Sequence, residues 1–321
     1  MNEHIDGMQR VPGEAELRLA LRGLRQDADP GQDLWPGIAA RIAALPRIEA
    51  TGSMTIDGYD TPIDLRVKVS FEGHRVLCDW AGTSGLDKKG INVPLVYTKA
   101  YACYALKCAI APEIPNNAAS LAPFEITAPV NSIVNAVHPA PVALRHVIGH
   151  MVPDTIYDAL DKMLPGIVPA EGAGCLCNFQ VSLRPRSDAP APKDAVRAEV
   201  LTFNSGGSGA RPTLDGMSAT AFPSGVMTMP VEATEQVGPV IIWRKELRPD
   251  SGGAGRYRGG LGQFMEVGAR EGHEFDFQAM FQAQLDRSIN LASYPNLFYP
   301  LRSNQKISSF VTEPWTGDNK D

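Results

Sequence analysis

The chain has 321 residues, of which 44% are hydrophobic and 21% are charged, a balance typical of a globular protein with a sizeable core. The net charge of -6 disfavours nucleic acid and anionic membranes as partners, because both attract clustered Lys and Arg. No apolar run is long enough to span a bilayer, and the N-terminal stretch lacks the apolar core of a signal peptide. The five cysteines, an odd number in apolar segments, predict reduced, buried thiols in a cytoplasmic protein: Cys78, Cys103, Cys108, Cys175 and Cys177.

Residues 1–60 are predicted to form a helical N-terminal segment. Apolar side chains at helical spacing predict helices at Glu14–Arg25 and Leu34–Leu45. Beyond this segment, Ile63–Ser70 alternates apolar and polar residues, which is the pattern of a half-buried strand. His74–Trp80 is predicted to be its return strand after a tight turn.

The rest of the chain is predicted to contain few helices and several paired strands. Val96–Ala111 is apolar nearly all round, which is typical of a buried helix, and Pro141–Leu164 is predicted to be helical with a kink near Pro153. Because the strands fall mostly in adjacent pairs, we predict an α+β fold of mixed antiparallel sheets with a few buried helices. The predicted strands are Phe124–Ala128, the hairpin Cys175–Leu183 with Ala195–Phe203, Val240–Arg244, Gln263–Ala269 and Glu274–Met280.

A first Gly-containing stretch begins at Asp79, where a predicted strand ends. Gly82, Thr83 and Ser84 follow, and a turn of this composition exposes backbone N–H groups and two hydroxyls that can hold a polar or anionic ligand. The alternative is a tight turn capped by Asp79, since turns favour these residues in any case. Ser84 is also a candidate nucleophile, although no histidine stands beside it in the sequence.

A second stretch, Asp250–Gly262, contains six glycines, which permit unusual backbone angles and close approach. Gly253 and Gly255 precede Arg256 and Arg258, which lie two residues apart and share a face if the segment is extended. Two guanidinium groups on one face can grip a carboxylate or a phosphate. No Gly-Lys-Ser/Thr follows, so the stretch is not a Walker A loop, and a purely structural loop is an equal alternative.

Two histidines on the predicted helix are a candidate metal site. His146 and His150 are four residues apart, so they share a helical face and can bind zinc, and Asp154 follows them. The Glu of a metalloprotease motif is absent, and a polar helix face or an interface is the alternative.

Two carboxylates, Glu232 and Glu235, follow Pro230 closely. Paired carboxylates can act as acid and base or bind a metal, and they can equally cap a turn or pair with Arg256. Asp215 stands before a glycine, which in most contexts indicates a turn.

Several ordered segments together resemble the hydantoinase B / 5-oxoprolinase family, which also includes the acetone carboxylase alpha subunit. The resemblance places a hydantoinase B-like core at residues 61–280 and a divergent C-terminal tail at 281–321. The family's N-terminal Asp/His motifs, of the His-Leu-Pro-Asp kind, are not found in this sequence. The matching segments are Val76–Ser84, Gly90–Asn92, Ile114–Asn116, Pro139–Val142, Leu214–Gly216, Met229–Glu235 and Asp250–Gly262.

The resemblance implies ATP-dependent opening of a cyclic amide. The ATP-binding chain, a hydantoinase A-type partner, phosphorylates the substrate carbonyl, and this chain, in a hetero-oligomer with a divalent metal (Zn, Mn or Mg), acts on the activated intermediate. A ketone carboxylase subunit is one alternative, and a non-catalytic scaffold or inactive truncated remnant is another. Both Gly-rich stretches are expected to contribute to one ligand-facing surface. The implied catalytic residues are Asp79, Thr83, Ser84, Glu232, Glu235, Arg256 and Arg258, and the implied substrate-binding residues are Gly82, Asn92, Asp215, Gly253 and Gly255.

Overall fold

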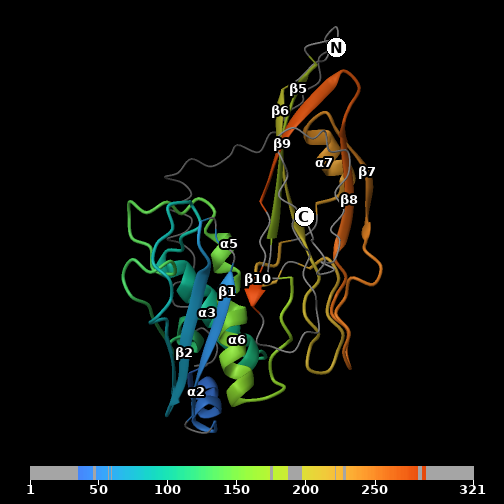
Figure 1. The fold of residues 1–321 in the computed structure, drawn as a ribbon. Coiled ribbons are helices and arrows are strands. Elements are labelled where there is room, and N and C mark those ends of the chain that lie inside the picture. Colours follow the sequence, from blue (N-terminus) through green and yellow to red (C-terminus); the bar gives the residue numbers. More distant parts are fainter. Residues whose placement is uncertain are drawn as a thin grey trace, which may run out of the picture.

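The computed structural model describes residues 35–45, 48–56, 58, 60–173, 176–186, 197–220, 222–226, 229–280 and 284–286. These residues form two halves that lie side by side (Figure 1). The first half is a sheet covered by helices, and the second half consists of two smaller sheets with one short helix. The predicted α+β class is confirmed.

The sheet of the first half has five strands in the order β10-β1-β2-β3-β4. Neighbouring strands are antiparallel except β3 and β4, which are parallel. Their bounds are β1 (Glu49–Ile56), β2 (Ile63–Glu72), β3 (Arg75–Asp79), β4 (Phe124–Thr127) and β10 (Gln284–Asp286).

The alternation in β2 explains how this sheet covers the core. The side chains of Ile63, Leu65, Val67, Val69 and Phe71 are all buried, and the residues between them are partly or fully exposed. Period-two alternation places the apolar set on one face of a strand. That face packs against helices to form the main core. The helices of this half are α2 (Trp35–Ala43), α3 (Leu95–Ile110), α4 (Ala118–Leu121), α5 (His146–Gly149) and α6 (Met151–Met163).

The second half centres on β5 (Leu176–Pro185), which pairs antiparallel with β6 (Ala198–Ser205) and with β9 (His273–Met280). A second antiparallel pair is formed by β7 (Val240–Leu247) and β8 (Gln263–Ala269), and α7 (Val231–Val237) precedes β7. A smaller hydrophobic cluster fills this half: Phe179, Val181, Leu183, Val200, Val240 and Val267.

Four expectations about the fold are wrong. Residues 49–56, expected within a helical segment, form strand β1. The helix break falls at His150 rather than near Pro153, because Pro153 occupies the first turn of α6, where a missing N–H has no helical acceptor. Residues 141–145 are not helical. Cys108 is exposed on α3, in contrast to the buried Cys78.

The helix predicted at Glu14–Arg25 lies outside the described residues. Within the described part of the chain, no helix is both long and apolar enough to cross a membrane.

Candidate functional site

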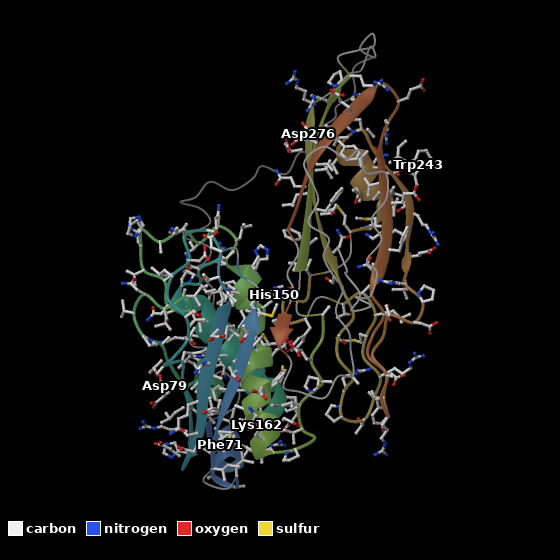
Figure 2. All side chains as sticks on the ribbon, in the orientation of Figure 1. Phe71, Asp79, His150, Lys162, Trp243 and Asp276 are labelled. Atoms are coloured by element: carbon white, nitrogen blue, oxygen red, sulfur yellow. The ribbon has the colours of Figure 1, made fainter. Side chains whose placement is uncertain are left out.

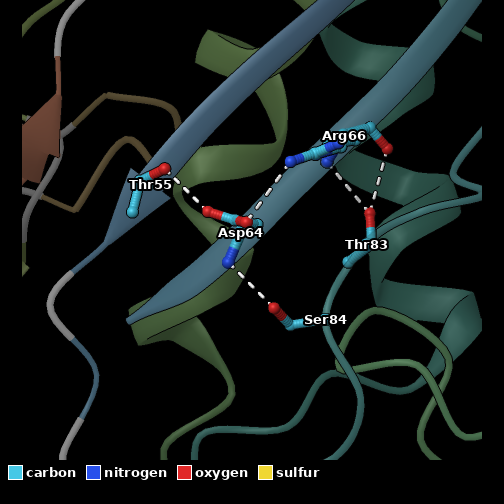
Figure 3. A network of polar contacts seen from close by, with 5 residues as sticks. All are labelled: Thr55, Asp64, Arg66, Thr83 and Ser84. Atoms are coloured by element: carbon cyan, nitrogen blue, oxygen red, sulfur yellow. Dashed lines mark hydrogen bonds and ion pairs between the residues drawn. The ribbon is translucent and has the colours of Figure 1, made fainter. Parts of the chain in front are cut away.

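The turn after β3 is fastened to β2 by its two hydroxyl groups (Figure 3). Ser84 Oγ accepts a hydrogen bond from the Asp64 N–H at 2.9 Å. Thr83 Oγ1 accepts from the Arg66 N–H at 3.0 Å and donates to the Arg66 carbonyl oxygen at 2.9 Å. Asp64 in turn accepts a hydrogen bond from Thr55 Oγ1 at 2.7 Å. The hydroxyls therefore replace strand-to-strand hydrogen bonds along β2.

Backbone donors of the same turn are also engaged. The Thr83 N–H donates to the Trp80 carbonyl at 3.3 Å, and the Ser84 N–H donates to the Asp64 carbonyl at 2.9 Å. Asp79 Oδ1 accepts from the Ala81 N–H at 3.1 Å, which caps the turn. Gly82 has a φ of 87°, a conformation that favours glycine. The geometry matches the structural alternative, a capped turn, and leaves neither the Thr83 nor the Ser84 N–H facing a ligand.

Asn92 organises the loop that follows this turn. Its side chain is fully buried. Oδ1 accepts from the Asp87 N–H at 2.8 Å, and Nδ2 donates to the carbonyl oxygens of Lys89 at 3.0 Å and Pro141 at 2.9 Å. Both ends of the amide are thus used inside the protein, where they hold residues 87–92 against the segment that leads to α5.

The second Gly-rich stretch is part of a three-segment structure, here called the glycine braid, formed by residues 170–173, 205–220 and 248–262. Backbone N–H and carbonyl groups bond directly between the segments rather than within a regular sheet. The cross-segment bonds include Ala170 N–H to Ala210 C=O (2.8 Å), Ala173 to Gly207 (2.9 Å), Gly260 to Ser208 (2.9 Å) and Gly216 to Arg258 (2.7 Å).

Close backbone approach explains the density of glycines in the braid. A Cβ atom on Gly209 would lie 1.7 Å from the Ala170 carbonyl oxygen, and one on Gly252 would lie 2.2 Å from the Gly259 carbonyl oxygen. Neither distance is compatible with a side chain, so glycine is required for packing at both positions. This requirement accounts for much of the motif without any ligand.

The braid nevertheless presents two arginines to solvent. Arg256 and Arg258 are both exposed, and the Arg256 guanidinium lies 5.5 Å from the centre of the Tyr257 ring. The Arg258 N–H donates to Asp215 Oδ1 at 2.8 Å, so Asp215 fixes the backbone that carries this side chain. The Arg258 guanidinium is 3.9 Å from Asp250, which is itself largely exposed. Gly253 is buried and Gly255 is exposed between these residues.

Glu232 and Glu235 lie on α7, away from the arginines. Glu235 Oε1 accepts a hydrogen bond from the Ile242 N–H at 2.8 Å near the start of β7, and Glu232 is exposed. The braid segment 248–262 begins after the other end of β7, at Leu247, about 17 Å along the strand from Ile242. Figure 1 shows α7 and the β7–β8 connection at opposite ends of this strand pair. The suggested pairing of these carboxylates with Arg256 is therefore wrong.

The two Gly-rich stretches also do not meet. Asp79 lies on the outer side of the first half (Figure 2), whereas residues 250–262 connect β7 to β8 in the second half (Figure 1). The expectation of a single ligand-facing surface that combines Asp79 with Arg256 and Arg258 is wrong for this structure. Each stretch has its own structural partner, which is β2 for the first and residues 205–220 for the second.

A buried polar cluster lies where the two halves meet. His150 is only 2% exposed, and its ring centre is 6.1 Å from that of His146 and 5.9 Å from that of Tyr101. The His146 ring in turn lies edge-on to Phe203 of β6, at 6.3 Å. Figure 2 shows His150 between the halves. The histidine face predicted from the sequence is therefore an internal face.

Two carboxyl groups extend this cluster. Asp154, one turn beyond His150, is 5% exposed, and burial together with the charge of Glu171 raises its pKa well above the ordinary value. Burial, reinforced by the charge of His146, lowers the pKa of His150 to about 4. Titratable groups in one cluster whose pKa values are shifted in opposite directions often mark functional sites. The sequence already placed Asp154 after the two histidines, whereas Glu171 carries no sequence signal.

The cluster does not fit the divalent metal site that the resemblance implies. Among the described residues, no group of three or more His, Cys, Asp or Glu side chains is arranged to hold a metal ion. His146 and His150 therefore do not form a metal centre with Asp154 or Glu171, and no step is assigned to a metal below.

The fold and the ordered motifs define a member of the hydantoinase B/oxoprolinase class. The family model of that name matches residues 37–290, and the chain belongs to this family. The match begins before residue 61 and continues beyond residue 280, so the family region is longer than the core expected from the motifs.

One sequence relative and two solved structures are similar to this chain. A putative B-type subunit of a D-/L-hydantoinase from Pseudomonas sp. (strain NS671) is 30% identical over 74% of this chain and 41% of its own length. The fold is shared with a nucleotide-free acetone carboxylase from work on ATP-dependent acetone carboxylation (TM-score 0.65, 16% identity, 79% of this chain, 36% of that chain). It is also shared with the ATP-dependent caprolactamase of Pseudomonas jessenii (TM-score 0.60, 21% identity, 80% and 44%). The chain thus spans less than half the length of each of these three proteins.

Proposed function

We propose that this chain provides the B-type part of an ATP-dependent cyclic-amide hydrolase and acts on an intermediate that a hydantoinase A-type partner has activated. The observation that carries this proposal is the exposed pair Arg256 and Arg258, held on the closely packed glycine braid within the region that matches the family. The 30% identical relative is named as one lettered subunit of a hydantoinase, which supports assembly with a second kind of chain.

The chemistry explains why an arginine pair suits this role. An amide is a poor electrophile, and phosphorylation of its oxygen creates a good leaving group. A phosphorylated oxygen carries negative charge before and during attack by water, and preorganised cations stabilise such charge. Arginine presents a planar fork that matches phosphate oxygens. The Arg258 backbone N–H is bonded to Asp215, so the backbone that carries the fork is fixed, while the guanidinium itself stays exposed to solvent.

The first Gly-rich stretch has a supporting role in this proposal. Thr83 and Ser84 hold the turn on β2, and Asn92 holds the adjoining loop, so these residues shape the first half rather than react. Gly82 allows the turn itself. Residues that contact substrate are proposed to lie on the braid, with Gly253 and Gly255 beside the arginines.

The test uses the chain assembled with a hydantoinase A-type partner, ATP, a divalent metal and a small cyclic amide. The double variant Arg256→Ala/Arg258→Ala is expected to lower turnover by about 100-fold or more, in line with the loss of transition-state cations. Arg75→Ala is a matched control, because Arg75 is equally exposed but pairs with Glu125 on the first sheet. Unchanged turnover in the double variant would remove the arginines from the mechanism.

Ketone carboxylation is the second candidate, because the fold is shared with an acetone carboxylase as closely as with a caprolactamase. The same assembly, given acetone and bicarbonate in place of the amide, distinguishes the two reactions by the product formed. Absence of both products, with the assembly intact, would favour a non-catalytic scaffold.

A further inference from the structure

The junction cluster forms a row that runs from a partly exposed side chain to a buried one. His146, His150 and Asp154 follow one another at intervals of four residues across α5 and α6. Each interval advances about 6 Å along a helix, in agreement with the 6.1 Å between the two imidazole centres. His146 is partly exposed, whereas His150 and Asp154 are buried.

His150 is the member of this row that most needs an explanation. Within the described part of the chain, its Nε2 atom is buried and has no hydrogen-bond partner. A buried, unpaired nitrogen costs about 1 to 3 kcal/mol, so apolar replacements would be more stable if packing alone mattered. Its ring contacts are Tyr101 and His146. A role in proton transfer accounts for an unpaired imidazole at this position.

The second half supplies the last member of the cluster. Glu171 acts electrostatically on Asp154, and its backbone belongs to the glycine braid, where its carbonyl oxygen would lie 2.8 Å from a Cβ on Gly209. The cluster therefore connects the helix face of the first half to the glycine braid, through its segment 170–173. Asp154 also acts electrostatically on Tyr157 of α6, which in turn interacts with Tyr104 and Cys108 of α3.

We propose that this face of α5 and α6 is a proton relay, in which Asp154 and Glu171 hold a proton and His150 and His146 pass it to the leaving nitrogen of the opened cyclic amide. This proposal rests on the proposed function and adds the residues that protonate the product. The buried position of Asp154 beside a second carboxyl group raises its pKa, which favours the protonated form.

The proton decides which bond of the reaction intermediate breaks. Water adds to the carbon of the phosphorylated amide and loses a proton, which leaves a carbon that carries a hydroxyl, a phosphate ester and the ring nitrogen. If the C–O bond to phosphate breaks, its electron pair leaves with phosphate, the cyclic amide is restored and ATP is wasted. If the C–N bond breaks, the electron pair stays on nitrogen, which requires a proton, and an acyl phosphate remains. A second water hydrolyses the acyl phosphate to carboxylate and phosphate. The proton lost by the first water restores the relay.

The measured quantity is therefore the amount of ring-opened product formed for each phosphate released by the assembled enzyme. His150→Ala is expected to lower this ratio by about 100-fold, the contribution of a positioned acid, while phosphate release continues. Added imidazole is expected to restore the ratio in His150→Ala, because the truncated side chain leaves space for it. His138→Ala is the matched control, since His138 is exposed on a loop of the same half.

An unchanged ratio in His150→Ala, or a parallel loss of both products without an imidazole response, would overturn the relay. A second measurement needs no partner. Infrared spectra of the chain near neutral pH are expected to show a protonated-carboxyl band that is lost in Asp154→Asn and kept in Asp158→Asn, because Asp158 pairs with the Lys162 ammonium at 2.8 Å. Absence of this band would overturn the relay even if ring opening occurs. If the band is present but the wild-type assembly opens no ring, the proposed function fails. The leaving nitrogen of a cyclic amide is then not the group that receives the proton.

Discussion

A Cβ atom on Gly207 would lie 1.9 Å from the carbonyl oxygen of Gly260. These two residues come from segments more than fifty positions apart in the sequence, and their backbones touch where side chains would normally separate them. The glycine braid is consequently a single packed unit, and the position of Arg256 and Arg258 depends on glycines in another segment. Substitutions far from the arginines are expected to disturb them.

Gly260→Ala is the direct test of this packing. The new methyl would lie 2.1 Å from the Met217 carbonyl oxygen, so the backbones must separate, and a loss of about 3 kcal/mol in the free energy of unfolding is expected. Gly85→Ala is the matched control, because a Cβ there meets nothing within 4 Å. Denaturant unfolding of both variants measures the difference, and equal stabilities would contradict close packing in the braid.

Thr83→Val tests whether the hydroxyls of the β3 turn are structural. Valine keeps the shape of the side chain but cannot bond the Arg66 N–H and carbonyl, so a loss of about 1 to 2 kcal/mol is expected. Thr83→Ser keeps both hydrogen bonds and should remain close to the wild type. Thermal melts of the two variants give the comparison; a valine variant as stable as the serine variant would show that the bonds contribute nothing.

The buried His150 predicts a specific dependence of stability on pH. Its pKa is about 4 in the folded chain, because of burial and then the charge of His146, against an ordinary value of 6.5. Between these values the unfolded chain binds a proton that the folded chain does not. The contribution of His150 to the free energy of unfolding is therefore fully present above pH 6.5. It falls towards pH 4, by on the order of 3 kcal/mol. His150→Phe should flatten this part of the curve, and His138→Gln, at an exposed site, should not.

Asp154 acts in the opposite sense. Its pKa is raised by burial and by Glu171, so the folded chain holds a proton that the unfolded chain releases above its ordinary value of 3.8. Stability from this group is present at low pH and is lost as pH rises through the folded pKa. Asp154→Asn should remove this loss, which denaturant midpoints at a series of pH values would reveal. A variant whose midpoints fall in parallel with the wild type would show that Asp154 is not the titrating group.

Lys107 is expected to stabilise the end of α3. Its ammonium is buried and donates to the carbonyl oxygens of Ala111 and Ile114, where the helix has ended. Lys107→Met removes both bonds and leaves these carbonyls unpaired, for an expected loss of about 2 kcal/mol. Lys99→Met changes an exposed lysine of the same helix and should be nearly neutral. Chemical denaturation decides, and similar midpoints for the two variants would be incompatible with this cap.

Elements with strong periodicity were predictable from the sequence. The alternation at Ile63–Ser70 became β2, and β8 has the predicted bounds Gln263–Ala269. Strand β1 was not predictable in the same way, because Glu49–Ile56 is rich in small and polar residues. A Cβ on Gly52 would lie 2.0 Å from the Thr155 carbonyl oxygen, so this strand is defined by α6 lying across it. Helix α7 was missed because it is short and follows a proline.

The sequence motifs of the site could be predicted, but the partners that their side chains bind could not. Composition identified the Asp79 turn and the braid, but hydroxyls that look free in the sequence are bonded to β2, a partner determined by the fold. The pairing of Asp154 with Glu171 joins a helix to a loop seventeen residues later, and no local pattern indicates it. Long-range contacts of this kind require the three-dimensional structure.

The pairing of β10 with β1 affects the order in which the first sheet can form. It pairs with β1 through Thr55 and Asp286, across more than two hundred residues of chain. During synthesis, the edge of β1 stays open until the whole second half has left the ribosome, and an open strand edge can pair with other chains. Strand β10 therefore covers the Thr55–Ile56 end of the β1 edge, and truncated chains that lack β10 would leave this end unpaired and open to aggregation.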